Sequence, residues 1–240
     1  MSKDFRLAVA GLQLEIVYFS RGRGEKMTSR HLFLFGGSPP FVDFTGEKFA
    51  NLSLNEKGKV AILFLEREGW KEYMPKYTAN LEAHGVNDFI YIPLASIYDQ
   101  SLLSQLASCT GVIIGGGDTA LYRDFIVDTA IGNVIKEMYE KGVPLAGFSA
   151  GALISPKNCV ISPIDNTKKK QLFLEGLGLL KDLVIAVHFT KWNEKDNLKS
   201  ALKKTGVSIG YGIDDEGYLY FENERLIDKG SRNFYVFNGL

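Results

Sequence analysis

The sequence is poor in the residues that build metal sites and disulfide frameworks. It has 2 cysteines and 3 histidines among 240 residues. The two cysteines, Cys109 and Cys159, are too few for a disulfide framework, so we expect a reducing cytoplasmic setting and treat both as packing residues. No Cys-x-x-Cys, His-x-x-x-His or His-Glu-x-x-His spacing occurs. We therefore expect no metal and no cofactor.

Long hydrophobic runs and an excess of charge are also missing. No stretch approaches 18 apolar residues, and residues 1–4 include an acid where a secretory signal carries only positive charge. Lys and Arg number 28 and Asp and Glu number 28, a balance that argues against a dedicated nucleic-acid binder. We expect neither a membrane nor a nucleic acid as partner. The length allows one large domain or two small ones, and 45% apolar residues suffice for a sizeable core. No internal repeat and no linker occur, so we expect a single domain over 1–240, with 1–30 as an N-terminal extension of uncertain structure.

Short apolar runs recur from residue 31 onward, separated by helical stretches. Uninterrupted runs of this length suit strands buried on both faces, and their alternation with helices predicts right-handed crossovers and a parallel sheet. We therefore predict an α/β fold with a mostly parallel sheet and helices on both faces. The expected strands are 31–35, 60–65, 89–94, 111–114, 143–148, 184–187, 211–221 and 225–237, with a strand or hairpin at 5–20, and the expected helices are 71–84, 102–107, 121–139 and 194–204.

The strongest motif is Gly147-Phe148-Ser149-Ala150-Gly151, which follows an apolar strand and precedes small residues that can begin a helix. Gly-x-Ser-x-Gly in that context predicts a nucleophile elbow, a tight turn that exposes the serine Oγ at the end of a strand. The amides of the following helix then face any oxyanion that forms there. Taken alone, the motif could equally be a glycine-rich turn that happens to contain serine.

A second glycine-rich turn, Gly115-Gly116-Gly117-Asp118-Thr119, ends another predicted strand. Three glycines allow a backbone to approach a ligand closely and to present its N–H groups. This turn could supply a second oxyanion donor. Its spacing matches neither a P-loop nor a Gly-x-Gly-x-x-Gly dinucleotide motif, so nucleotide binding is disfavoured.

A serine nucleophile needs a base and an acid that orients it. His31 opens a core strand and His84 ends a helix, whereas His188 follows the strand 184–187, at the strand end where α/β sites assemble. His188 is therefore the favoured base. Asp165 is the first choice for the acid, and Asp215 and Glu216 are the alternatives, although acidic turn residues are common on any surface.

These motifs resemble the peptidase E and cyanophycinase family of serine peptidases, whose fold is related to class I glutamine amidotransferases. The resemblance covers roughly 31–225 and rests on the two glycine-rich motifs, on Val187-His188-Phe189-Thr190 and on Gly210–Asp215. It implies a flavodoxin-like three-layer sandwich. It also implies Ser149 as nucleophile, His188 as base and an acid fifteen to eighteen residues after the serine, a window in which Asp165 is the only acid.

The resemblance further implies that the Gly117 and Ala150 amides form the oxyanion hole. Asp118, Thr119 and Lys191 become the candidate substrate-binding residues. Relatives place basic residues shortly after the histidine to hold acidic or aspartyl substrates. Here the segment is Thr190-Lys191-Trp192-Asn193-Glu194, without arginine, so Lys191 is a possible substitute.

The expected activity is hydrolysis of a small peptide or isopeptide by a dipeptidase-like or exopeptidase-like enzyme, as a monomer or homodimer. Residues 157–204 hold 10 Lys and Arg against 5 Asp and Glu, which predicts a positive field near His188 and acidic substrates. Two alternatives stay open. One is an esterase of the α/β-hydrolase type, and the other is a non-catalytic family member that binds a peptide or small ligand. An amidotransferase is less favoured because Ser149 stands where that chemistry uses cysteine.

Overall fold

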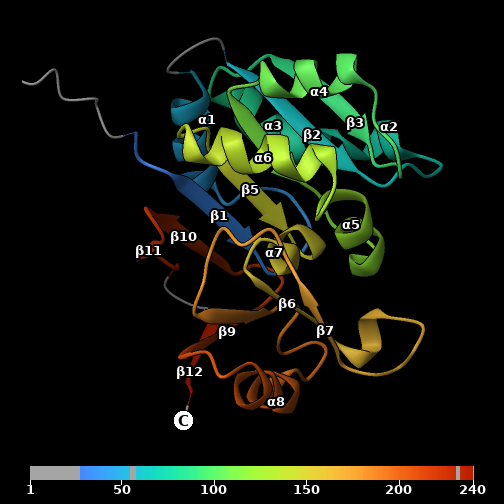
Figure 1. The fold of residues 1–240 in the computed structure, drawn as a ribbon. Helices are drawn as coiled ribbons and strands as arrows, with labels where there is room; N and C mark the ends of the chain where they lie inside the picture. Colours follow the sequence, from blue (N-terminus) through green and yellow to red (C-terminus); the bar gives the residue numbers. More distant parts are fainter. Residues whose placement is uncertain (1–27, 55–57, 231–232, 240) are drawn as a thin grey trace, which may run out of the picture.

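The computed structural model describes residues 28–54, 58–230 and 233–239 (Figure 1). The strand or hairpin predicted at 5–20 and nearly all of the predicted extension lie outside these residues. That the chain forms one domain stays a prediction.

A seven-stranded sheet forms the centre of the fold, in the order β11-β10-β1-β5-β4-β2-β3. Its parallel strands are β1 (His31–Phe35), β5 (Leu145–Phe148), β4 (Gly111–Ile114), β2 (Lys59–Phe64) and β3 (Asp88–Pro93), and antiparallel β10 (Tyr218–Glu222) and β11 (Arg225–Asp228) complete one edge. Every residue of β1, β4 and β5 is buried, as uninterrupted apolar runs predict. The predicted α/β class with a mostly parallel sheet is confirmed.

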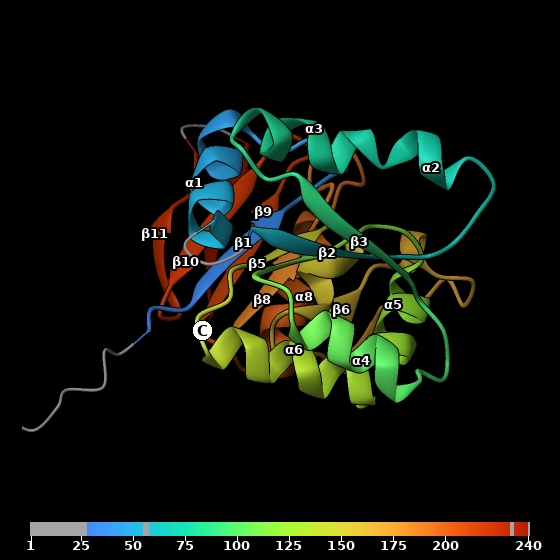
Figure 2. The same cartoon turned by 90° about the horizontal axis from the view of Figure 1, so that it is seen from above.

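Helices cover both faces of this sheet (Figure 2). On one face lie α1 (Asp43–Leu54), α2 (Trp70–Tyr73) and α3 (Pro75–Ala83), and on the other lie α4 (Gln100–Ala107), α5 (Thr119–Ile126) and α6 (Ala130–Glu140). Phe49 and Leu81 are fully buried in the apolar layer on the first face, and Leu106 and Ile135 in the layer on the second. Within the described ranges, no helix combines the length and apolar character that a bilayer crossing requires.

Two features on these faces differ from the sequence prediction. The helix α1 was not predicted, since Gly46 and several small polar residues weaken its helical pattern. The helix predicted over 121–139 is broken into α5 and α6. Val127 is extended, Asp128 has a positive φ, and the Thr129 hydroxyl caps α6 by accepting from the Gly132 amide.

A smaller layer lies beyond the carboxyl end of β5 (Figure 1). It contains the sheet β12-β9-β8 and the hairpin β6-β7. Its elements are α7 (Ala150–Ile154), β6 (Asn158–Ile161), the short 3-10 helix η1 (Pro163–Asp165), β7 (Leu172–Glu175), β8 (Leu183–Ala186), α8 (Lys195–Thr205), β9 (Ile209–Ile213) and β12 (Phe234–Asn238). The strands predicted over 211–221 and 225–237 are each split. Their first and last parts, β9 and β12, pair in the small sheet, while β10 and β11 join the large one.

Candidate active site

Ser149 lies in the turn between β5 and α7. Its backbone has φ 47° and ψ −102°, a conformation that non-glycine residues rarely adopt. The flanking glycines permit the turn. A Cβ on Gly147 would lie 2.5 Å from the Gly151 carbonyl oxygen, and a Cβ on Gly151 would collide with the carbonyl of Ile114. The strand, strained turn and helix have the geometry of a nucleophile elbow.

His188 lies beside this serine. Its Nε2 is 2.9 Å from the Ser149 Oγ. The end of β1 holds both residues, because the Ser149 amide donates to the Phe35 carbonyl and the His188 amide donates to the next carbonyl, that of Gly36, each at 3.0 Å. His188 follows β8 and also has a positive φ, 47°. The backbones of Ser149 and His188, far apart in the sequence, are thus held side by side by two successive carbonyls of the segment that ends β1.

Asp215 is the acid that contacts the imidazole. Its Oδ1 is hydrogen-bonded to His188 Nδ1, and its Oδ2 accepts from Lys191 Nζ at 3.2 Å. Partial burial raises the pKa of this carboxyl, but hydrogen bonds from His188 and Lys191 and the charge of both groups outweigh burial, so its pKa is lower than usual. Glu216 is exposed in the same turn. The structure therefore places one of the alternative acids at the imidazole, rather than the first choice, Asp165.

Asp165 lies in η1, and its carboxyl is hydrogen-bonded to the start of α5 and not to the imidazole. Its Oδ2 accepts a 2.6 Å hydrogen bond from the Thr119 hydroxyl. Burial is the main cause that raises its pKa to about 6, and the charge of Asp118 adds to the effect. Sequence distance from the serine pointed to Asp165. The chain between them, however, runs out through β6 and carries Asp165 to the start of α5, away from the imidazole Nδ1.

Two glycines that follow β1, Gly36 and Gly37, determine which acid reaches the imidazole. A Cβ on Gly36 would lie 2.6 Å from the Ile213 carbonyl carbon, and one on Gly37 would lie 2.7 Å from the Asp215 Cα. Only glycine lets the end of β9 pack this closely against the end of β1. In the sequence this pair is recognisable only as the end of the apolar run 31–35. Because these glycines allow this close packing, Asp215 reaches His188.

The glycine-rich turn after β4 packs against the nucleophile, since a Cβ on Gly116 would lie 3.3 Å from the Ser149 Cβ. Two buried tyrosines hold this turn. The Gly116 amide donates to the Tyr77 hydroxyl at 3.2 Å, and the Tyr122 hydroxyl donates to the Gly116 carbonyl at 3.1 Å. Burial raises the pKa of both phenols, so both stay neutral donors and acceptors. The peptide before Gly117 is thereby fixed in orientation.

The two expected oxyanion donors belong to the two turns that meet at Ser149, the turn after β4 and the turn after β5. Gly117 is exposed at the end of this turn. Ala150 is the first residue of α7, and the first amides of a helix have no acceptor within the helix. The part of both amides in an oxyanion hole stays a prediction.

The three expected substrate-binding side chains all make contacts within the protein. Asp118 caps α5 by accepting from the Leu121 amide at 3.1 Å. Thr119 is fully buried and bonds Asp165, and Lys191 bonds Asp215. Their part in substrate binding stays a prediction.

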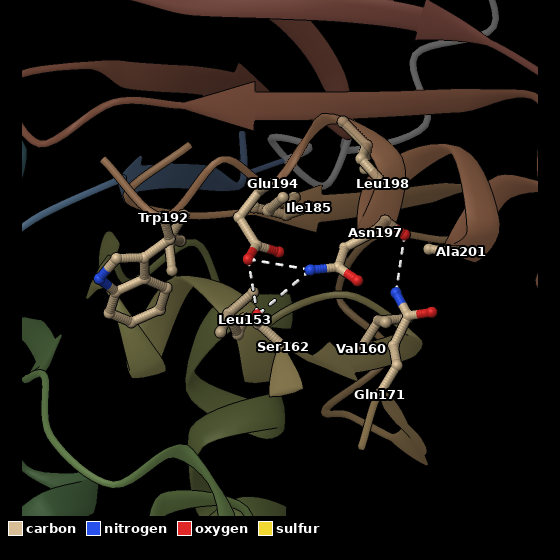
Figure 3. Close-up of a pocket in the computed structure, with 12 residues that line it drawn as sticks. Leu153, Val160, Ser162, Gln171, Ile185, Trp192, Glu194, Asn197, Leu198 and Ala201 are labelled. Atoms are coloured by element: carbon tan, nitrogen blue, oxygen red, sulfur yellow. Dashed lines mark hydrogen bonds between the residues drawn. The ribbon is translucent and has the colours of Figure 1, made fainter. Parts of the chain in front are cut away.

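A buried polar cluster joins Ser162 to the segment that follows His188 (Figure 3). Ser162 donates to the Glu194 carboxyl at 2.6 Å, and the Asn197 amide donates to the same oxygen at 3.1 Å. Burial raises the pKa of Glu194. The adjoining cavity holds only about 10 Å³, room for one water at most. Trp192, on the same loop, packs its ring 4.3 Å from the His188 ring, so this region braces the base and is too small for a substrate.

Most of the chain matches a known protein family. Residues 55–228 match the model of peptidase family S51. The chain belongs to peptidase family S51. The resemblance inferred from the glycine-rich motifs and His188 is confirmed.

Named relatives of this S51 chain include a cyanophycinase from Synechococcus elongatus, 27% identical over 144 residues, which are 57% of this chain and 45% of that protein. The chain spans about half the length of such curated relatives. A solved peptidase from an acI-B1 Actinobacterium has a TM-score of 0.67 at 18% identity, with 88% of each chain covered. A structure named for peptidase E, from Listeria monocytogenes EGD-e, has a TM-score of 0.61 at 20% identity, covering 85% of this chain and 98% of that one. At these identities the two structures show the shared fold.

Proposed function

We propose that this S51 chain is a serine peptidase that hydrolyses a small peptide or isopeptide through an acyl-enzyme. The observation that carries the proposal is the continuous line of contacts from the Ser149 Oγ to His188 and from His188 to Asp215. A nucleophile, a base in hydrogen-bond reach and a third group that orients the base make up the catalytic triad of acyl-transfer enzymes. Membership of the family supports the same activity.

In this mechanism Asp215 accepts a hydrogen bond from the protonated Nδ1 of a neutral imidazole. That tautomer leaves the Nε2 of His188 free to accept the hydroxyl proton as Ser149 attacks the scissile carbonyl carbon. The carboxylate then stabilises the imidazolium that forms. Lys191 keeps Asp215 ionised, since its hydrogen bond and charge favour the anion.

The amides of Gly117 and Ala150 receive the negative charge of the tetrahedral intermediate. A single donor of this kind typically lowers the barrier by about 2.7–4 kcal/mol. His188 next gives its proton to the leaving amine as the carbon–nitrogen bond breaks. Water then attacks the acyl-enzyme with His188 again as base, which releases the acid product and restores the Ser149 hydroxyl.

The first test is Ser149→Ala, assayed on a library of dipeptides and isopeptides. We expect turnover to fall by about 10⁶-fold, the usual cost of removing a triad serine. The fold should persist, since the amide of residue 149 still donates to Phe35. Ser104→Ala, an exposed serine on α4, is the matched control and should keep wild-type rates.

Other results would favour the alternatives. Unchanged hydrolysis by Ser149→Ala would remove the serine from the mechanism. Turnover of esters without turnover of peptides would favour an esterase. Failure of Ser149 to react with a fluorophosphonate would favour a protein that binds a peptide or small ligand without hydrolysing it.

A further inference from the structure

A cavity of about 300 Å³ adjoins the glycine-rich turn on the side away from the histidine. The sheet order makes this placement clear, because His188 is attached to the end of β1 on one flank of β5, while the cavity lies at the ends of β4 and β2 on the other flank. Gly116 and Gly117 form its wall nearest Ser149. The rest is lined mainly by large apolar side chains, among them Leu65, Trp70, Tyr73, Met74, Tyr77 and Tyr122.

Two hydroxyl groups of this lining make hydrogen bonds within the protein. The hydroxyls of Tyr77 and Tyr122 are bonded to the Gly116 peptide, and both side chains are almost fully buried in the wall behind the more exposed Leu65, Trp70 and Tyr73. The Arg67 guanidinium lies over the Tyr73 ring at 5.5 Å from its centroid. The lining of the cavity is thus mainly aromatic and aliphatic.

Charge at the mouth of the cavity does not favour an acid. The charged lining residues are one cation, Arg67, and two carboxylates, Glu66 and Asp118. An acidic side chain would meet no net positive field there. The positive field predicted around His188 lies on the other flank of β5 and would act on a different part of the substrate.

We propose that this cavity binds a large apolar or aromatic side chain of a residue that flanks the scissile bond. The proposal rests on the proposed peptidase function and adds the class of substrate. The volume is within the range of specific ligand sites. Burial of an aromatic side chain in such a lining corresponds to a preference of tenfold or more over alanine.

The test compares kcat/KM for dipeptide pairs that carry Phe or Ala at each of the two positions. We expect a preference for Phe of at least tenfold at one position. Leu121→Trp enlarges a side chain at the cavity, where Leu121 is 42% exposed, and should lower the Phe to Ala ratio by at least fivefold. Leu174→Trp, a comparably exposed leucine on β7, should leave the ratio unchanged.

A second measurement separates this proposal from the peptidase function. Ser149→Ala is titrated with N-acetyl-phenylalanine amide and N-acetyl-alanine amide by calorimetry, without and with Leu121→Trp. Tighter binding of the phenylalanine compound, lost with Leu121→Trp, supports the cavity even if no dipeptide is hydrolysed. Equal binding of the two amides, or equal kcat/KM in an active wild-type enzyme, overturns the cavity proposal and leaves the peptidase proposal standing.

Discussion

Two carboxylates approach the candidate site from different loops, and their environments act on them in opposite directions. The Asp215 side chain is 41% exposed, contacts His188 and Lys191, and has a lowered pKa. Asp165 is more buried, contacts the Thr119 hydroxyl, and has a pKa raised to about 6. The two partners hydrogen-bonded to Asp215 therefore outweigh burial there, whereas the Thr119 hydroxyl and the more distant charge of His188 do not outweigh burial at Asp165. The comparison predicts that the less buried acid serves the imidazole.

The largest difference should appear in the amide variants of the two acids. Asp215→Asn removes the charge that orients His188 and stabilises the imidazolium, so we expect kcat to fall by about 10⁴-fold with KM little changed. Steady-state kinetics on one dipeptide measures both constants. A fall in kcat of less than tenfold in Asp215→Asn would contradict its role as the acid of the triad. A larger loss of kcat in Asp165→Asn than in Asp215→Asn would assign that role to Asp165.

Asp165→Asn should act mainly on stability. Because the folded-state pKa of about 6 lies above the ordinary value of 3.8, the folded protein binds this proton more tightly than the unfolded chain does. Stability from this group is therefore present below pH 4 and is lost as pH rises through 6, by on the order of 2 kcal/mol.

The asparagine variant removes this titration and can still accept from Thr119. We expect its melting temperature to exceed that of the wild type at pH 8, with the gap closing by pH 4. Thermal denaturation at pH 4, 6 and 8 measures the trend. A gap that widens toward low pH would contradict the raised pKa.

The smallest effect should come from Lys191→Met. Lys191 is exposed, and exposed ion pairs are worth about 0–1 kcal/mol, so we expect kcat/KM to fall by no more than about fivefold. Measuring acidic and neutral peptides at low and high salt separates two contributions. A loss confined to acidic peptides at low salt supports the predicted positive field, and an equal loss for all peptides assigns Lys191 to the support of Asp215 alone.

The central sheet and the elbow could be predicted because each depends on a local pattern. An apolar run followed by Gly-x-Ser-x-Gly fixes a buried strand, a turn and the position of Ser149. The placement of Asp215 depends instead on the packing of β9 against Gly36-Gly37, a contact between segments far apart in the chain. Sequence spacing carries no information on that contact, so Asp215 stood only as one of three candidates. Tyr77 and Tyr122, which hold the glycine-rich turn after β4, could not be predicted for the same reason.

The two successive carbonyls at the end of β1 have a consequence for folding. The carbonyls of Phe35 and Gly36 accept hydrogen bonds from Ser149 and His188, which are synthesised much later in the chain. Asp215, which packs against Gly37, is synthesised later still. Contacts of such long sequence separation form late, because the loops between them must close first. A growing or partly folded chain therefore carries Ser149 without its base and acid, and the proposed peptidase can act only after its own folding is complete.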